Sequence, residues 1–149
     1  MITLQKHKND VWEIKINRPE KANSLSSSML EELLSIFDKA AEARGVVLTG
    51  QGTTFSAGAD LNEVKSGLAI SPIWEKLSEK IAKLNCITIA ALNGTVAGGA
   101  FGMILACDIR ICVPKARFFY PVMKMGFLPQ PSDPKRLIRL IGPSRAKLM

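Results

Sequence analysis

The sequence of 149 residues predicts a mixed α/β fold, and three observations support this prediction. Short apolar runs typical of buried strands alternate with longer segments in which apolar residues recur every three or four positions. Loops rich in glycine and alanine follow two of the apolar runs. Apolar residues make up 47% of the chain, enough for a packed core. We therefore expect one α/β domain that covers residues 1–149.

The chain is predicted to begin with a β-hairpin and a helix. Residues 2–6 and 11–16 read as two strands, because apolar and charged residues alternate in the second run, and residues 8–10 supply the turn. The helix is expected at residues 27–43, and Gly45 lies just past its end. Ser28 and Glu31 have the spacing of a capping box near its start. The apolar stripe of this helix consists of Met29, Leu30, Leu33, Leu34, Phe37, Ala40 and Ala41.

Two further strands and two further helices are predicted in the middle of the chain. Buried strands are expected at residues 46–49 and 87–92, each directly before a glycine-rich loop. An amphipathic helix begins near Ser71-Pro72, and a shorter one spans residues 99–107. The stripe of the amphipathic helix consists of Ile73, Trp74, Leu77, Ile81 and Leu84.

The last elements are predicted to be a strand, an extended segment and two helices. Ile109, Ile111 and Val113 form the strand, and the extended segment contains Phe118 and Tyr120. Asp133-Pro134 opens a helix to about Ile141, and Gly142-Pro143-Ser144 opens another, inside which the given sequence stops. We therefore expect apolar surface near the C-terminal end, either exposed or covered by a partner.

The two small-residue loops carry the clearest chemical signal. They are residues 55–60, Phe-Ser-Ala-Gly-Ala-Asp, and residues 93–100, Asn-Gly-Thr-Val-Ala-Gly-Gly-Ala. Small residues after a strand leave backbone N–H groups uncovered, and two such groups that converge bind a negative oxygen. The alternative is that both turns need small residues only for packing. The pair predicts a chemistry in which a carbonyl becomes an oxyanion.

Together with residues 17–25, Asn-Arg-Pro-Glu-Lys-Ala-Asn-Ser-Leu, these loops resemble the enoyl-CoA hydratase/isomerase (crotonase) superfamily. The resemblance runs from Ile2 to Met149, and the order of the three motifs makes it specific. It implies a spiral of ββα units that binds coenzyme A thioesters as substrates, without a prosthetic group. Family members continue with helices that close the acyl pocket and build a trimer. We therefore expect that the C-terminal helical part is absent here, and that the full-length protein is a homotrimer or hexamer.

The resemblance also implies roles for individual residues. The N–H groups of Ala59 and Gly99 would hold the thioester oxygen. The residues that would line the coenzyme A site are Ala57, Asp60 and Leu61 beside the adenine and pantetheine, and Lys21, Ala22 and Ser24 on the other side. Asp60 is also expected to cap the following helix, and Lys21 would contact a phosphate or simply be solvated.

Three positions depart from the family pattern. The two glutamates with which hydratases add water fall on Gly102 and Val122, and neither glycine nor valine transfers a proton. The later carboxylate of related isomerases and dehalogenases falls on Gln130. Among nearby polar residues, Asp133 is expected to be a helix N-cap before Pro134, and Tyr120 to pack in a strand with its hydroxyl satisfied locally.

Three functions remain open from the sequence. The first is acyl-CoA binding with enolate stabilisation by a family enzyme that is a poor hydratase. The second is a non-catalytic coenzyme A-binding or assembly subunit with the same fold. The third is an enzyme that uses an unfamiliar acid, such as Asp133 or a residue beyond Met149.

Composition narrows the other classes of function. The net charge of +7 suits nucleic acid, the phosphates of coenzyme A, or a solvated face. The chain has no nucleic-acid motif and few aromatic residues, so nucleic acid is not expected as a partner. Lys135, Arg136 and Arg139 read as the polar face of a helix. No metal site or catalytic triad is expected, because the single histidine, His7, lies in the first hairpin.

The compartment is predicted to be the cytoplasm. No apolar run is long enough to cross a bilayer, and no secretory signal is seen, so no membrane association is expected. The cysteines, Cys86, Cys107 and Cys112, lie among apolar residues without CxxC spacing. They are expected to be buried, reduced thiols.

Overall fold

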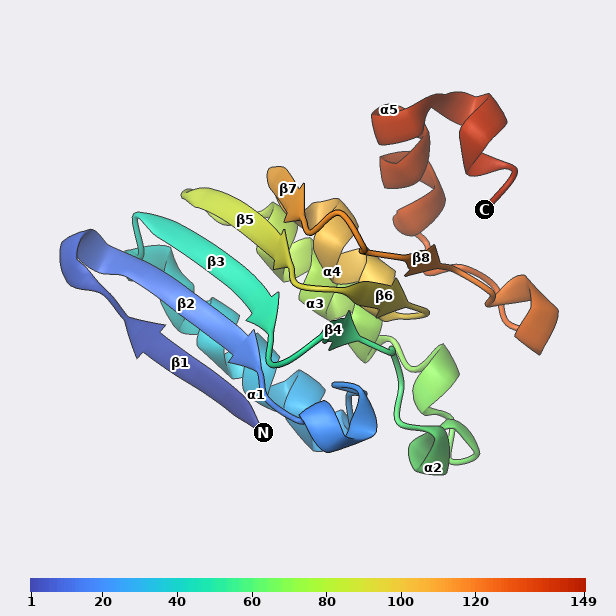
Figure 1. Ribbon diagram of the computed structural model, residues 1–149, viewed down its shortest axis with the longest axis horizontal. Helices are drawn as coiled ribbons and strands as arrows, with labels where there is room; N and C mark the ends of the chain where they lie inside the picture. The colour runs from blue at the N-terminus through green and yellow to red at the C-terminus, as the bar shows by residue number, and fades with distance from the viewer.

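A five-stranded sheet forms the centre of the computed structural model, which describes all residues from 1 to 149 (Figure 1). Its order is β1-β2-β3-β5-β7. The strands are β1 (Ile2–Lys6), β2 (Val11–Ile16), β3 (Gly45–Gly50), β5 (Ile87–Leu92) and β7 (Ile109–Cys112). The predicted hairpin is confirmed by the antiparallel pairing of β1 with β2, and every later pairing in this sheet is parallel.

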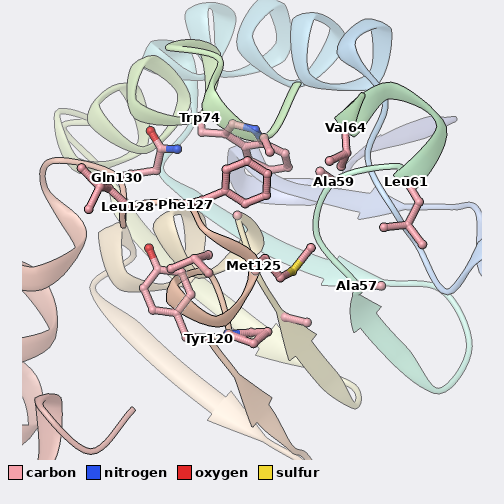
Figure 2. Close-up of a pocket in the computed structure, with 16 residues that line it drawn as sticks. Ala57, Ala59, Leu61, Val64, Trp74, Tyr120, Met125, Phe127, Leu128 and Gln130 are labelled. Atoms are coloured by element: carbon pink, nitrogen blue, oxygen red, sulfur yellow. The ribbon is translucent and has the colours of Figure 1, made fainter. Parts of the chain in front are cut away.

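A second, smaller sheet consists of three short parallel strands in the order β4-β6-β8. They are β4 (Thr54–Ser56), β6 (Thr95–Ala97) and β8 (Phe118–Phe119). Each follows a strand of the central sheet, and a helix comes next, so the unit ββα occurs three times. The predicted spiral of ββα units is confirmed. The carboxyl ends of the three short strands lie beside the cleft drawn in Figure 2.

Five helices complete the fold. They are α1 (Ser27–Lys39), α2 (Leu61–Val64), α3 (Ile73–Ala82), α4 (Ala100–Ala106) and α5 (Asp133–Ala146), with 3-10 turns at Lys8–Asp10, Pro19–Lys21, Ala40–Glu42, Leu68–Ile70 and Met123–Met125. The helices α1, α3 and α4 pack in a row along one face of the central sheet (Figure 1). Gly142 (φ 79°, ψ 161°) breaks α5 into the two helical pieces that the sequence predicts.

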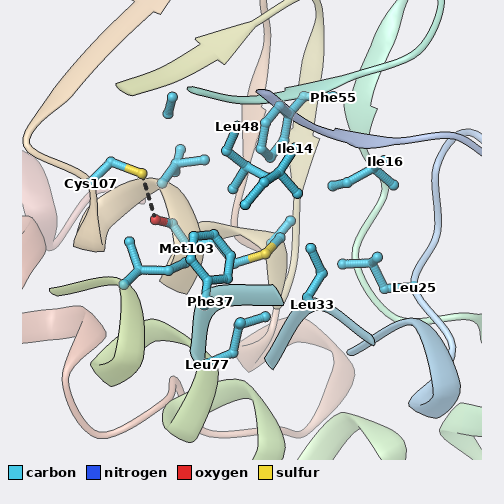
Figure 3. Close-up of a cluster of buried hydrophobic side chains, with 14 of the residues drawn as sticks. Ile14, Ile16, Leu25, Leu33, Phe37, Leu48, Phe55, Leu77, Met103 and Cys107 are labelled. Atoms are coloured by element: carbon cyan, nitrogen blue, oxygen red, sulfur yellow. Dashed lines mark hydrogen bonds between the residues drawn. The ribbon is translucent and has the colours of Figure 1, made fainter. Parts of the chain in front are cut away.

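The core lies between the central sheet and this row of helices. Ile14 and Leu48 point from the sheet toward Leu33 and Phe37 of α1, and all four are almost completely inaccessible to solvent (Figure 3). The alternation of buried and half-exposed residues in β2 and β3 places one face of each strand against the helices. Burial of this apolar surface is the main force that stabilises the fold.

The ends of α1 differ from the prediction. The N-cap is Ser26, whose hydroxyl accepts a hydrogen bond from the N–H of Met29, because the chain is still extended at Ser26. Ser28 already belongs to the helix and contacts the Ser26 hydroxyl. At the other end the α-helix stops at Lys39 and a 3-10 turn follows. Gly45 is the first residue of β3, not a helix cap.

Apolar side chains are exposed at the C-terminal side of the fold, as predicted. The strand β7 lies at the edge of the central sheet, where Ile111 is 60% exposed. Other exposed apolar side chains in the last third of the chain are Phe118, Phe119, Met123, Leu128, Leu140 and Leu148. Cys107 is buried and Cys86 is partly buried, but Cys112 is exposed because it lies on this edge strand. For Cys112, the prediction of a buried thiol is therefore wrong.

Candidate functional site

An open, mostly apolar cleft lies where β4, β6 and β8 end (Figure 2). Ala57 follows β4, Gly98 follows β6, and Tyr120 follows β8, and all three line the cleft. Ligands of α/β proteins commonly bind at the carboxyl ends of parallel strands. Its mostly apolar lining is typical of small-molecule sites.

The two small-residue loops touch at the cleft. Gly58 has φ +89°, a conformation that favours glycine, and a Cβ there would lie 2.8 Å from the carbonyl oxygen of Ala97. The same Cβ would lie 3.3 Å from the nitrogen of Gly99. Only a glycine at position 58 lets the first loop approach the second this closely.

Two backbone N–H groups at this contact have no hydrogen-bond acceptor. The N–H groups of Ala59 and Gly99 are absent from the hydrogen bonds of the loops, although both residues line the cleft. Their neighbours are paired: Asp60 N–H donates to Leu25 O at 2.9 Å, and Gly98 N–H donates to Phe119 O at 3.0 Å. Unpaired N–H groups at an apolar cleft are suited to bind an oxygen of a ligand.

Trp74 forms another wall of the cleft, a role that the sequence analysis missed because the residue fitted the core stripe of α3. A Cβ on Gly99 would lie 2.9 Å from the Trp74 ring, so the indole packs directly on this glycine. The indole N–H donates to Leu68 O at 2.8 Å, which fixes the ring. No sequence signal separates such a wall residue from an ordinary core residue.

The residues expected to bind coenzyme A fall into two neighbouring groups. Ala57 and Leu61 line the cleft, and Leu61 is 72% exposed. Lys21 and Ala22 are exposed in and beside a 3-10 turn, and Ser24 follows them, half-buried. The Ala57 N–H donates to Ala22 O at 3.0 Å, so the two groups are adjacent.

Asp60 caps α2, as predicted. Its carboxylate accepts from the N–H of Asn62 at 2.9 Å and from the Arg18 guanidinium at 2.5 Å. The bond from Asn62, and then the bond from Arg18, lower the pKa of Asp60. Asp60 therefore holds the first loop in place as an ionised group.

Asn23 is a buried linker that the sequence analysis did not single out. Its amide donates to Gln51 O at 2.8 Å and to Thr54 O at 2.6 Å, and its side-chain oxygen accepts from Arg18 N–H at 2.8 Å. The backbone is left-handed there, with φ 55°. Asparagine tolerates this conformation better than most residues, which is the only local signal.

Asp133 is not the N-cap that the sequence predicts. Its carboxylate is fully buried inside the protein, and the Tyr120 hydroxyl donates to its Oδ2 at 2.5 Å. Its Oδ1 is buried and has no hydrogen-bond partner. The Tyr120 ring stacks on Phe101 with 4.8 Å between centroids. The Tyr120 hydroxyl has a partner, as predicted, but the partner is not local, because Asp133 lies 13 residues away, and Tyr120 follows β8 instead of lying in it.

Burial raises the pKa of Asp133 to about 6, although the Tyr120 hydroxyl and the charge of Arg136 act against this change and Glu75 adds to it. The pKa of Tyr120 is raised too, mainly by burial and secondly by the charge of Asp133. The prediction that Arg136 lies on a solvated helix face is wrong. Its guanidinium donates a hydrogen bond to the buried Ser78 hydroxyl at 2.7 Å. The Glu75 carboxylate accepts hydrogen bonds from the N–H and the hydroxyl of Ser132.

Gly102 lies directly beside this buried carboxylate. A Cβ on Gly102 would be 3.2 Å from Asp133 Oδ1 and 3.5 Å from the Ser78 Cβ. Asp133 thus reaches, from α5, the space next to the position on α4 where a longer side chain would project. Val122 and Gln130 line the cleft, and neither carries a carboxylate.

No three histidine, cysteine, aspartate or glutamate side chains cluster closely enough to hold a metal ion. None of the helices has the length and apolar character needed to cross a membrane.

Comparison with known proteins identifies similar sequences and structures. Residues 6–149 match the profile of a family described as enoyl-CoA hydratase/isomerase. The chain is 37% identical over 145 residues to probable enoyl-CoA hydratase echA6 of Mycobacterium tuberculosis, covering 93% of this chain and 58% of that protein. It is 30% identical over 154 residues to ethylmalonyl-CoA decarboxylase of Homo sapiens, covering 97% and 50%.

A solved structure gives the same result. The crystal structure of enoyl-CoA hydratase from Bacillus anthracis matches with a TM-score of 0.89 and 34% identity, covering 99% of this chain and 60% of that one. The chain therefore spans half to three fifths of the length of these relatives.

Proposed function

Because the chain belongs to the enoyl-CoA hydratase/isomerase family, we propose that it binds an acyl-CoA thioester and stabilises the enolate of the acyl group. The observation that carries this proposal is the pair of unpartnered N–H groups, from Ala59 and Gly99, on one apolar cleft. A thioester oxygen placed between them gains negative charge as the enolate forms, and fixed N–H dipoles stabilise that charge.

The rest of the ligand fits the surface around the first loop. Ala57 and Leu61 would lie along the pantetheine, with Asp60 holding their loop and Lys21, Ala22 and Ser24 bordering the nucleotide. Lys21 is exposed and free to approach a phosphate. The net charge of +7 favours the approach of an anionic ligand.

A ligand analogue tests the role of the carbonyl without any change to the protein. The natural full-length protein is titrated with butyryl-CoA and with the matched S-butyl-CoA thioether, which lacks only the carbonyl oxygen. Two hydrogen bonds of about 1 kcal/mol each correspond to about 30-fold weaker binding of the thioether. Equal dissociation constants in isothermal titration calorimetry would contradict the proposal.

Hydration of enoyl-CoA is expected to be slow. An acid or base placed at the reacting atoms contributes about 10²–10⁴-fold, and Gly102 and Val122 supply neither. Measurable affinity for crotonyl-CoA with negligible hydration, followed by the loss of enoyl absorbance, is the expected outcome. Efficient hydration would show that another group does this chemistry. The paired change Gly102→Glu with Val122→Glu is not a simple rescue, because position 102 faces the Asp133 carboxylate.

The second candidate function is a non-catalytic coenzyme A-binding or assembly subunit. It is favoured by the same two positions, Gly102 and Val122, which carry no proton-transfer group. We place either form in the cytoplasm as a homotrimer or hexamer of one acyl-CoA-binding domain per chain, because the exposed apolar surface at β7 and β8 suits an interface. Analytical ultracentrifugation of the full-length protein tests the assembly, and a monomer would contradict it.

A further inference from the structure

We propose that Tyr120 and Asp133 form a proton relay between the interior of the protein and the α-carbon of the bound acyl group. This inference rests on the proposed function, because it requires an acyl-CoA thioester in the cleft. It assigns Tyr120 as the group that touches the substrate and Asp133 as a residue that acts through Tyr120.

The first observation is the position of the tyrosine. Tyr120 follows β8 and lines the same cleft as Ala59 and Gly99, and Figure 2 shows its ring on the side opposite Leu61. Stacking on Phe101 fixes the ring, so the hydroxyl keeps one place. The hydroxyl donates its hydrogen bond to Asp133, the backbone N–H of Gln130 faces the same oxygen, and a second lone pair of that oxygen is left to accept a proton.

The second observation is the incomplete pairing of the carboxylate. A buried carboxylate oxygen without a partner is costly, and a purely structural aspartate would use both oxygens. The Arg136 guanidinium, on the same helix, donates to the Ser78 hydroxyl and makes no hydrogen bond to Asp133, and Glu75 accepts from the Ser132 hydroxyl. The surroundings therefore leave Asp133 able to gain and lose a proton, with Tyr120 as its one hydrogen-bond donor.

The third observation is the space beside Gly102. Because glycine has no side chain, Asp133 Oδ1 fits against α4 at 3.2 Å from the Cβ position. A larger residue at position 102 would displace the carboxylate. The absence of a side chain at position 102 and the presence of Asp133 on α5 are thus parts of one arrangement.

The α-carbon–hydrogen bond of the thioester breaks, and its electron pair becomes part of the enolate whose oxygen faces Ala59 and Gly99. The Tyr120 oxygen accepts that proton while its own hydroxyl proton passes to Asp133 Oδ2. The acyl group has then lost one proton and Asp133 has gained one. The reverse sequence protonates an enolate that arises by any other route, such as loss of carbon dioxide.

The direction of transfer sets the pH dependence. Abstraction of the α-proton requires an ionised Asp133, which faces Tyr120, Arg136 and Glu75. The rate should therefore rise with pH through the pKa of Asp133, about 6, and become level above it.

The test is exchange of α-protons of butyryl-CoA in deuterated water, followed by proton NMR with the full-length protein. Tyr120→Phe keeps the stacked ring and removes only the hydroxyl, and Asp133→Asn keeps the shape and removes the base. Each is expected to slow exchange about 100-fold or more, while the dissociation constant of butyryl-CoA changes less than about threefold. The rise in rate near pH 6 should disappear in Asp133→Asn.

Asp108→Asn is the matched control. Asp108 also accepts hydrogen bonds, from the N–H and hydroxyl of Thr88 at 2.8 Å, but it lies outside the cleft. Its exchange rate should equal that of the unmodified protein.

The possible failures are distinguishable. Absence of butyryl-CoA binding overturns the proposed function itself. Binding without α-proton exchange, or exchange that survives in Tyr120→Phe, overturns the relay alone. If Asp133→Asn does not fold, Tyr120→Phe and the pH profile of the unmodified protein still decide the question.

Discussion

Asp60 and Asp133 both stand at the first turn of a helix beside the cleft, yet their surroundings are opposite. Asp60 accepts hydrogen bonds from Asn62 and from the Arg18 guanidinium, and its pKa is lowered. Asp133 accepts one bond, from Tyr120, has an unpartnered oxygen, and has a raised pKa. The comparison shows that a position at a helix start does not define a role, because the partners of each oxygen decide it.

The difference also separates two parts of the cleft. On the side of Asp60 the backbone is held in place and the charge is permanent, which suits a loop that presents N–H groups. On the side of Asp133 the charge is adjustable, which suits proton transfer.

The largest expected effect is on the pH dependence of stability at Asp133. Its pKa is about 6 in the folded state against 3.8 as the ordinary value. Because its pKa is raised, the folded state favours the protonated carboxyl of Asp133. The free energy of unfolding is therefore highest at acid pH and falls as pH rises through about 6. The difference of about two pH units corresponds to about 3 kcal/mol.

Urea unfolding of the unmodified protein and of Asp133→Asn checks this value. Between pH 4 and pH 7.5, the free energy of unfolding of the variant should rise by up to about 3 kcal/mol relative to that of the unmodified protein. A constant difference across this range would show that Asp133 titrates normally and would remove the contrast with Asp60.

A smaller effect of opposite sign is expected at Asp60. Its lowered pKa means that its charge stabilises the fold above the ordinary pKa of aspartate, and this contribution is lost as pH falls. Asp60→Asn keeps a good helix cap and removes only the charge that faces Arg18. The same unfolding series should show the variant less stable at neutral pH, with the difference shrinking toward pH 3. A variant of unchanged stability would mean that the Arg18 pair contributes nothing.

The smallest effect is expected at Ser26, which caps α1 without an ion pair and so measures a cap alone. Ser26→Ala should cost about 1 kcal/mol, the usual value of an N-cap hydrogen bond. Ser28→Ala, two residues later in the same helix start, should change the stability by less than about 0.5 kcal/mol. The opposite ranking would restore Ser28 as the cap that its spacing with Glu31 suggests.

The sequence predicts the central sheet, the longer helices and the cap at Asp60, but not the short strands β4 and β6, which overlap the two segments expected to be loops. Hydrophobic periodicity located the hairpin, the parallel strands and the helices to within a few residues, because burial on one face dictates that pattern. Asp60 could be identified as a cap because its hydrogen-bond partner, Asn62, lies two residues away. Local patterns predict local partners.

The remainder depends on contacts between residues far apart in the sequence. Asp133 accepts a hydrogen bond from Tyr120, 13 residues away, and packs from α5 against Gly102 of α4. Nothing in its own segment distinguishes it from a helix cap. Arg136 meets Ser78 across 58 residues, so its charge suggested a solvated face. The apolar neighbours of Cys112 in the sequence predict a buried thiol, whereas its strand, β7, lies at the edge of the sheet.

The two edges of the central sheet are chemically unequal. At β1 the exposed side chains include Thr3, Gln5 and Lys6, and a charged lysine at an edge discourages another strand from pairing. At β7 the exposed side chains include Ile109 and Ile111, beside backbone groups that have a neighbour on one side only. The edge at β7 therefore resists pairing with another strand less than the edge at β1 does, and Ile111→Lys would make the two edges alike.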